Sequence, residues 1–192
     1  MRLFVAIGLD DRVRKTLRRL QDELRPRCAD VRWTPPEQLH ITVKFLGEVE
    51  DRRVTEIASA VGAAAGRCTP FELRVLNAGC FPARGEVRIV WAGVEDAEKG
   101  AAKCAELVES GLEAIGFARE SRAFSPHITI GRVRADHSNG KLRGLMESAR
   151  SGPDVQQVGN LRLMSSVLSA HGSEYATVAS LQLGVQAPDL AR

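Results

Sequence analysis

The stretch Leu39-His40-Ile41-Thr42-Val43-Lys44-Phe45-Leu46 is rich in β-branched residues and predicts a short strand. Side chains of a strand alternate between its two faces, so His40 and Thr42 should project from the same face, about 7 Å apart. The intervening apolar residues should point the other way, under covering helices: Ile41, Val43 and Phe45. We therefore expect this strand to present an imidazole and a hydroxyl together.

A second stretch, Pro126-His127-Ile128-Thr129-Ile130-Gly131-Arg132, repeats this pattern. The two histidines are separated by 127 − 40 = 87 residues, and the same offset aligns Phe4-Val5-Ala6 with Trp91-Ala92-Gly93. With this offset, the predicted strands of the first half align with those of the second, and the first residues of the predicted helices align as well. This pattern indicates an internal duplication.

The hydrophobic periodicity predicts an α+β fold of two pseudo-symmetric β-α-β-α-β lobes, at approximately residues 1–81 and 86–183. Each lobe should bury a helix-covered sheet face, and the remaining faces could line a shared groove. Because no linker-like segment separates the halves, we expect residues 1–192 to form a single bilobal domain. The first half should contain strands at 2–8, 39–46 and 71–76, helices from Asp10 to Leu24 and from Asp51 to Gly66, and a loop at 31–36. The second half should contain strands at 87–94, 161–168 and 175–183 beside the second His strand, and helices at 97–115 and 141–149.

The composition limits which cellular compartments and which cofactors are compatible with the chain. The chain has 192 residues, of which 44% are hydrophobic, but no apolar run approaches the 18 residues that cross a bilayer. Its first ten residues are too short and too soon acidic for a signal peptide, so we expect a cytoplasmic protein. The four cysteines lack metal-ligand spacing, which is typical of free thiols. The net charge of +3 does not by itself indicate a nucleic-acid partner.

A pair of histidines suits a reaction in which one side chain removes a proton and the other donates one. A histidine has an ordinary pKa of about 6.5, so two of them can act as base and acid near neutrality. Displacement at phosphorus fits, because the attacking and leaving oxygens lie on opposite sides of the phosphorus atom. The hydroxyls of Thr42 and Thr129 could donate hydrogen bonds to the phosphate without a metal ion. A strained 2′,3′-cyclic phosphate would be an apt substrate.

The paired motifs resemble those of the two-histidine (2H) phosphoesterase superfamily. More narrowly, the chain resembles the RNA 2′,3′-cyclic phosphodiesterases of the LigT-like group, historically called 2′-5′ RNA ligases. Beyond the two His-x-Thr motifs, the likeness is carried by Arg2–Ile7, Trp33, Phe81-Pro82, Val90–Gly93, Phe124-Ser125, Ser166-x-Leu168, Gly172 and Tyr175. It departs at Ser165, where the group often has an acidic residue.

The resemblance implies a bilobal α+β fold with mainly antiparallel sheets around a central cleft, helices on the outside and terminal strands that could be exchanged between the lobes. The activity it implies is hydrolysis of RNA 2′,3′-cyclic phosphate ends to 2′-phosphates, with no metal or other cofactor. It also implies that His40 is the proton donor and His127 the proton acceptor. The spacing of the motifs alone leaves these two roles interchangeable.

Other residues are candidates for contact with the substrate. Arg132 could bind phosphate, although strict alternation places it opposite His127 unless the strand bulges near Gly131. Lys44 shares the parity of His40, so it would either face the cleft or be solvated at the strand end. Aromatic residues that could stack on a nucleobase are Trp33, Phe81, Phe124 and Tyr175.

Two other functions remain compatible with the sequence. The same site could join RNA ends through a 2′-5′ bond, or the groove could bind nucleotide or RNA without turnover. We expect the partners to be RNA ends or small nucleotide 2′,3′-cyclic phosphates, with no membrane, no obligate protein partner and a monomeric chain. His137 and His171 lie in turn-like contexts, which are typical of solvated loop residues.

Overall fold

The computed structural model describes residues 1–138, 140–169 and 172–185. The strands are β1 (Arg2–Gly8), β2 (Val31–Trp33), β3 (His40–Glu48), β4 (Phe71–Phe81), β5 (Ile89–Glu95), β6 (His127–Val133), β7 (Arg150–Val158), β8 (Asn160–Ser169) and β9 (Gly172–Gln182). The α-helices are α1 (Asp11–Leu24), α2 (Val54–Gly66), α3 (Gly100–Glu113) and α4 (Lys141–Ser148). Short 3-10 helices span Arg25–Arg27, Pro36–Gln38 and Asp51–Arg53.

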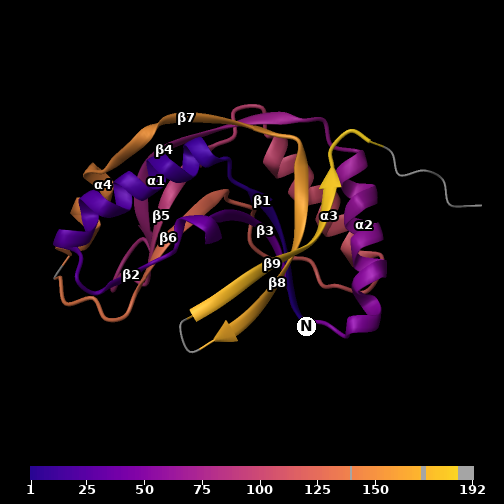
Figure 1. Cartoon of the computed structure of the whole chain (residues 1–192), viewed down its shortest axis with the longest axis horizontal. Coiled ribbons are helices and arrows are strands. Elements are labelled where there is room, and N and C mark those ends of the chain that lie inside the picture. The colour runs from indigo at the N-terminus through magenta and orange to yellow at the C-terminus, as the bar shows by residue number, and fades with distance from the viewer. Residues whose placement is uncertain (139, 170–171, 186–192) are drawn as a thin grey trace, which may run out of the picture.

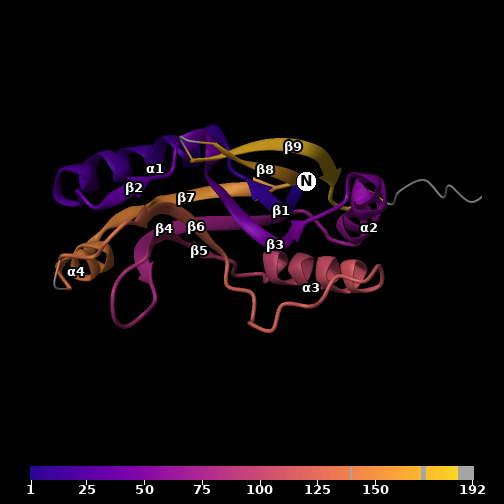
Figure 2. The same ribbon diagram turned by 90° about the horizontal axis from the view of Figure 1, so that it is seen from below.

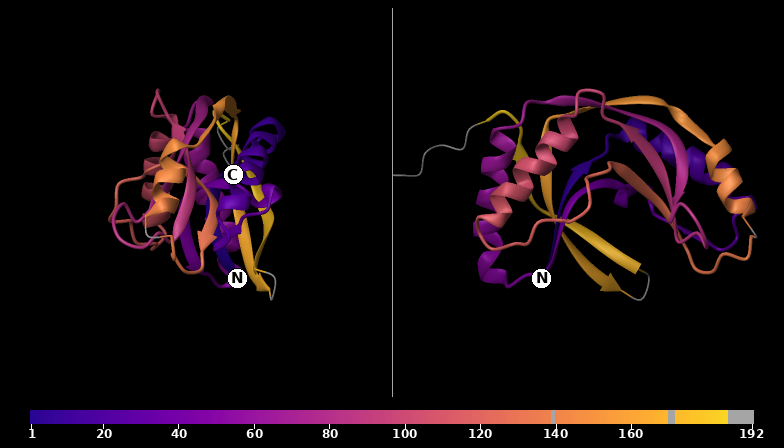
Figure 3. Two further views of the ribbon diagram at one scale, coloured as in Figure 1. Left: turned by 90° about the vertical axis from the view of Figure 1, so that its left-hand side faces the viewer. Right: turned by 180° about the vertical axis from the view of Figure 1, so that it is seen from behind.

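One sheet runs through the molecule in the order β7-β4-β5-β6-β3-β1-β8-β9, with β2 paired to β6. Every strand pairing in the described residues is antiparallel. The sheet bends into an arch (Figures 1 and 3). Strands of the first half pair with strands of the second at three places: β4 with β5 and β7, β1 with β8, and β3 and β2 with β6.

The helices lie in two groups at the two ends of the arch. Helix α2 packs against α3 and β9, and α3 also contacts β3, whereas α1 contacts β7 and α4 contacts β4. Figure 2 shows α1 and α4 at one end of the molecule and α2 and α3 at the other. The α+β fold with antiparallel sheets and outer helices, predicted from the sequence, is confirmed.

Helix α1 illustrates why the local sequence was sufficient to predict a helix. The side chain of Asp10 accepts a hydrogen bond from the backbone N–H of Val13 at 2.8 Å and so caps the helix. The apolar residues at helical spacing are all buried: Val13, Leu17, Leu20 and Leu24. The predicted start of α2 at Asp51 was wrong, because Asp51 begins a 3-10 turn and α2 starts at Val54.

The sequence prediction missed two strands. Strand β2 occupies part of the expected loop at residues 31–36, where three residues pair with β6. Strand β7 carries Gly152 and Pro153, which weaken a strand pattern, but it is the edge strand of the sheet and pairs only with β4 among the described strands. Strand β4 also extends past the predicted end at Leu76, as far as Phe81.

Two predictions concern composition. All four cysteines are buried and free, as predicted: Cys28, Cys68, Cys80 and Cys104. In the part of the chain that the structure describes, no helix is long and apolar enough to cross a bilayer.

Lys44 lies neither in the cleft nor at a solvated strand end. Its ammonium group is 2.6 Å from a carboxylate oxygen of Glu109 on α3, and it also donates to the carbonyl oxygen of Ala118 at 2.8 Å. Its side chain is only 6% exposed and that of Glu109 13%. Strand β3 therefore carries a buried ion pair on the face that α3 covers.

This ion pair should be sensitive to the loss of one partner. Replacing Lys44 by Met leaves the Glu109 carboxylate buried without a cation, so we expect the free energy of unfolding to fall by about 3–5 kcal/mol. Urea denaturation followed by circular dichroism measures this change. The double variant K44M/E109L should recover most of the loss, and R52A, which breaks the exposed pair of Arg52 with Glu50, should cost about 1 kcal/mol or less. A cost for K44M no larger than that for R52A would contradict the prediction.

Candidate active site

The two motif strands meet at a single residue pair, Ile41 of β3 with Ile128 of β6. Each isoleucine is the middle residue of its His-x-Thr motif. The strands are antiparallel, so this pairing brings His40 beside Thr129 and Thr42 beside His127. Both isoleucines are buried on the opposite face. The sheet thus gathers the four polar side chains around one point.

Each motif strand contains an irregularity immediately after its threonine. Along β3, Thr42 pairs with Ala6 and Lys44 with Val5, so Val43 is an extra residue relative to β1. Along β6, Thr129 pairs with Trp91 and Gly131 with Val90, so Ile130 is extra relative to β5. These are β-bulges, and they lie at positions related by the same offset of 87 residues.

The bulges reverse the alternation of the residues that follow. Val43 and Lys44 are both buried, and Phe45 returns to the face of His40, where it is 68% exposed. The sequence prediction that Phe45 lies under the helices was wrong, because it assumed a regular strand. The ring of Phe45 contacts that of Phe4 at a centroid distance of 5.9 Å, which places it on the groove side.

The second bulge acts in the same way on Arg132. Ile130 and Gly131 are both buried, and Arg132 is exposed opposite Ile89, on the face that also carries His127 and Thr129. Arg132 is therefore the counterpart of Phe45 in the second motif. The buried side chain of Gln21 donates a hydrogen bond to the carbonyl oxygen of the bulged Ile130 at 2.9 Å, which stabilises this irregular backbone.

Both imidazoles are held through the same nitrogen. Nδ1 of His40 lies 2.7 Å from the carbonyl oxygen of Gln38, and Nδ1 of His127 lies 2.9 Å from that of Ser125. A carbonyl only accepts, so Nδ1 carries the proton in each ring. Nε2 of each histidine is then left to take or give a proton in the groove.

Each imidazole also meets the ring of a residue from the other half of the chain. Tyr175 makes an edge contact with His40 at 5.2 Å, and Phe81 makes the equivalent contact with His127 at 5.2 Å. A further ring lies behind each pair, Phe4 in one lobe and Trp91 in the other. The structure therefore brings two of the four predicted stacking candidates, Phe81 and Tyr175, to the histidines.

The other two aromatic candidates lie elsewhere. Trp33 pairs with Gly131, which places it on the face opposite His127, and its ring packs against the core below the guanidinium of Arg25. Phe124 is half-buried against the hydrophobic core. His137 lies 3.4 Å from Asp30 outside the groove, and His171 lies outside the described residues.

The electrostatic environment lowers the pKa of His40 from its ordinary value. Burial is the main cause, and the positive charges of Arg132 and His127 act in the same direction. The hydrogen bond to the Gln38 carbonyl opposes this effect by favouring the charged ring. These influences show that Arg132 and His127 lie close enough to the ring of His40 to act on its charge.

A cavity of about 310 Å³ lies beside His127. Its walls include Phe81, Trp91, Asn77 and Glu95. The Trp91 indole can lie flat against β4 because Gly79 has no side chain, and a Cβ at that position would overlap the indole ring. The site thus continues from His127 into an aromatic-walled hollow.

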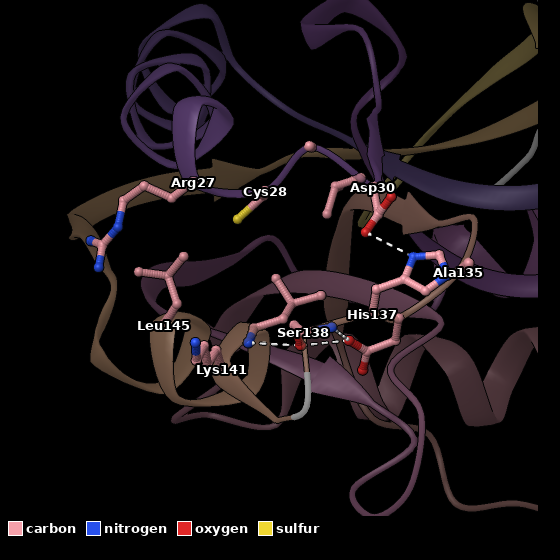
Figure 4. Close-up of a pocket in the computed structure, with 12 residues that line it drawn as sticks. Arg27, Cys28, Asp30, Ala135, His137, Ser138, Lys141 and Leu145 are labelled. Carbon is pink, nitrogen blue, oxygen red and sulfur yellow. Dashed lines mark hydrogen bonds and ion pairs between the residues drawn. The ribbon is translucent and has the colours of Figure 1, made fainter.

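A larger cavity of about 400 Å³ lies apart from both motifs, between residues 27–31 on one side and residues 135–138, 141, 142 and 145 on the other (Figure 4). Its carboxylates already have partners, because Asp30 contacts His137 and Asp136 accepts hydrogen bonds from Ser138. In the described residues, no group of three or more His, Cys, Asp or Glu side chains could hold a metal ion, there or at the histidines.

An arched antiparallel sheet that carries two His-Thr pairs on one face defines a two-histidine phosphoesterase. Residues 7–91 match the model of the family described as LigT like Phosphoesterase. The chain is 32% identical over 163 residues to the RNA 2′,3′-cyclic phosphodiesterase of Methanothermobacter thermautotrophicus, covering 85% of each chain. It is 31% identical over 182 residues to the protein of that name from Thermotoga maritima, covering 95% of each. The chain therefore belongs to the LigT-like phosphoesterase family.

Solved structures show the same fold. The TT0787 protein of Thermus thermophilus superimposes with a TM-score of 0.78 at 28% identity, covering 97% of this chain and 100% of that one. E. coli LigT, in its complex with 3′-AMP, superimposes with a TM-score of 0.79 at 24% identity, covering 95% and 97% of the two chains.

The cause of the lowered pKa of His40 can be tested directly. Replacing Arg132 by Ala removes a positive charge that disfavours the imidazolium, so we expect the pKa of His40 to rise toward its ordinary value. Titration of the His40 ring protons by NMR measures this change. The control R18A removes an equal charge from the outer surface of α1, where Arg18 is 70% exposed, and should leave the pKa of His40 unchanged. An unchanged or lower pKa in R132A would contradict the placement of Arg132.

Proposed function

We propose that the protein hydrolyses RNA 2′,3′-cyclic phosphate ends to 2′-phosphates by acid and base catalysis with its two histidines. The observation that carries this proposal is the Ile41–Ile128 bridge, because it sets His40 and His127 on one face with a threonine beside each. The names of the relatives support the same substrate class. Substrates include RNA ends and small nucleotide 2′,3′-cyclic phosphates.

In this mechanism the cyclic phosphate lies between the two imidazoles. Nε2 of His127 takes a proton from water as the water oxygen bonds to phosphorus. The bond from phosphorus to the 3′ oxygen breaks, and Nε2 of His40 gives that oxygen a proton. Thr42, Thr129 and Arg132 donate hydrogen bonds to the non-bridging oxygens, where negative charge is concentrated. The product carries a phosphate on its 2′ oxygen.

The lowered pKa of His40 bears on its role as the acid. In the free protein, burial and nearby cations favour the neutral ring, which cannot donate a proton from Nε2. A bound phosphodiester brings a negative charge next to the imidazole and favours the charged ring. Substrate binding therefore recruits the proton that the leaving oxygen needs.

We further propose that the protein acts as a monomer and a single bilobal unit in the cytoplasm. Both histidines and their ring partners come from one chain, so the site needs no second subunit. The free, buried cysteines are consistent with a reducing compartment.

Loss of either histidine should abolish most of the activity. We expect H40A and H127A each to lower kcat on adenosine 2′,3′-cyclic phosphate by about 10²- to 10⁴-fold, in buffer that contains EDTA. Phosphorus NMR measures the rate and identifies the product. The control H137A removes a histidine outside the groove and should retain the wild-type rate.

The product distinguishes the competing functions. A 2′-5′ diester formed from added RNA halves would favour the ligase, and binding without turnover would favour the non-catalytic module. Wild-type turnover in both H40A and H127A would exclude the proposed mechanism.

The rate should depend on pH through a bell-shaped curve, because one histidine must be neutral and the other charged. For kcat/KM, which reports the free enzyme, we expect the limb that belongs to His40 to lie below the ordinary histidine value, since the pKa of His40 is lowered. For kcat, which reports the bound complex, this limb should lie at higher pH, because the substrate anion raises the pKa of His40. Initial rates from about pH 4 to 9 test both limbs, and a monotonic rise across neutrality would contradict the shared roles.

A further inference from the structure

Arg162 of β8 lies beside the site but belongs to neither motif. In the sheet, Ala6 of β1 pairs with Thr42 on one side and with Arg162 on the other. The three residues thus lie in line across the sheet, on the groove face. Adjacent strands are about 4.7–4.9 Å apart, so the Cα atoms of Thr42 and Arg162 are separated by about 10 Å.

The guanidinium of Arg162 extends along β1 toward the first histidine. Its central carbon lies 2.5 Å from the position that a Cβ on Gly8 would occupy, and Gly8 is the residue that pairs with His40. The guanidinium therefore covers Gly8, and between Thr42 and Arg162 the floor of the groove is the small side chain of Ala6. A ribose or a sugar-phosphate backbone could lie over Ala6.

The charge of Arg162 is not neutralised by the protein. Within the described residues, no acidic side chain pairs with it and no acceptor receives a hydrogen bond from it, although the residue is half-buried. None of its nitrogen atoms is closed off from solvent. A guanidinium presents five N–H donors in a planar fork that matches phosphate, so an unpaired one beside a phosphate site is suited to a second phosphate.

The opposite lobe lacks an equivalent cation among its described residues. There the residue that pairs with the histidine is Gly93, and a Cβ on it would overlap the side-chain oxygen of Asn77, a neutral amide. The adjoining cavity contains the carboxylate of Glu95, which disfavours an anion. The two sides of the reacting phosphate are thus electrostatically different.

We propose that Arg162 binds the phosphate on the 5′ oxygen of the nucleoside that carries the cyclic phosphate. This inference rests on the proposed function, in which the leaving 3′ oxygen, and therefore this nucleoside, lies on the side of His40. The reacting phosphate is held by Thr42, Thr129 and Arg132, and Arg162 stands further along the same side, beyond β1. In RNA the 5′ phosphate is the diester to the preceding nucleotide, and in a mononucleotide it is a terminal phosphate.

The exposed ring of Phe45 and the edge of Tyr175 lie on the same side of the groove. They offer apolar surface to the base of this nucleoside, and base stacking on aromatic side chains is common in the recognition of RNA ends. One nucleotide would then be held at its base, its 5′ phosphate and its cyclic phosphate.

The test compares three substrates: adenosine 2′,3′-cyclic phosphate, the same nucleotide with a 5′-phosphate, and the dinucleotide ApA ending in a 2′,3′-cyclic phosphate. For the wild type we expect kcat/KM to be about tenfold or more higher on the two substrates with a 5′ phosphate, mainly through a lower KM. In R162A and R162Q, the ratio of kcat/KM on a substrate with a 5′ phosphate to kcat/KM on adenosine 2′,3′-cyclic phosphate should fall toward one. Preference for the dinucleotide alone identifies the diester as the ligand, and preference for both identifies any 5′ phosphate.

Two further variants isolate the interaction. G8A keeps the arginine but displaces its guanidinium, so it should lower the same ratio, whereas R18A, with an equal change of charge on α1, should leave it unchanged. Thermal melting shows whether each variant is folded. Equal rates of the wild type on all three substrates, or an unaltered ratio in folded R162Q and G8A, would overturn the role of Arg162. Failure of the wild type to hydrolyse any of the three would instead overturn the proposed function.

Discussion

The pairing of Ile41 with Ile128 is the contact on which the site depends. It is the only residue pair that joins β3 to β6 in the described sheet, and it lies at the centre of both motifs. Because the strands are antiparallel there, the two halves of the chain contribute equivalent residues on the two sides of this pair. A shift of one residue in either strand would turn the histidine and the threonine of that strand toward the helices, so the burial of both isoleucines fixes the register as well as the fold.

The paired histidines could be predicted from the sequence because regular alternation holds over the three residues of each motif. Beyond Thr42 the prediction failed, since a bulge inserts one residue and reverses the faces, whereas beyond Thr129 the bulge considered near Gly131 is present and returns Arg132 to the groove face. Lys44 lies on the helix face, where it pairs with Glu109, and Phe45 lies in the groove. Hydrophobic periodicity carries no signal for a bulge whose extra residue is itself a buried Val or Ile.

The contribution of the other half of the chain to each histidine was also hidden in the sequence. Phe81 and Tyr175 were candidates as aromatic residues that could stack on a base. Only the pairing of β4 with β5 brings Phe81 to His127, and only the pairing of β9 with β8 and of β8 with β1 brings Tyr175 to His40. Arg162 could not be found at all, because a lone arginine on a strand is ordinarily solvated. What distinguishes it is the missing side chain of Gly8, which is distant in the sequence but adjacent in space.

The pseudo-symmetry of the two lobes explains why His40 and His127 lie in equivalent positions, and unequal neighbours distinguish the two rings. Both rings are anchored through Nδ1 and edged by an aromatic side chain, so nothing in the anchoring separates them. The residues around the two rings differ. Phe45 in the first motif is replaced by Arg132 in the second, and the guanidinium of Arg162 over Gly8 is replaced by the neutral amide of Asn77 over Gly93. Burial and the nearby cations favour the neutral form of His40 in the free protein, and in the proposed mechanism a bound anion reverses this preference. A symmetric scaffold thus holds two imidazoles in equivalent positions, and in that mechanism a few charged side chains placed unequally on it assign the roles of acid and base.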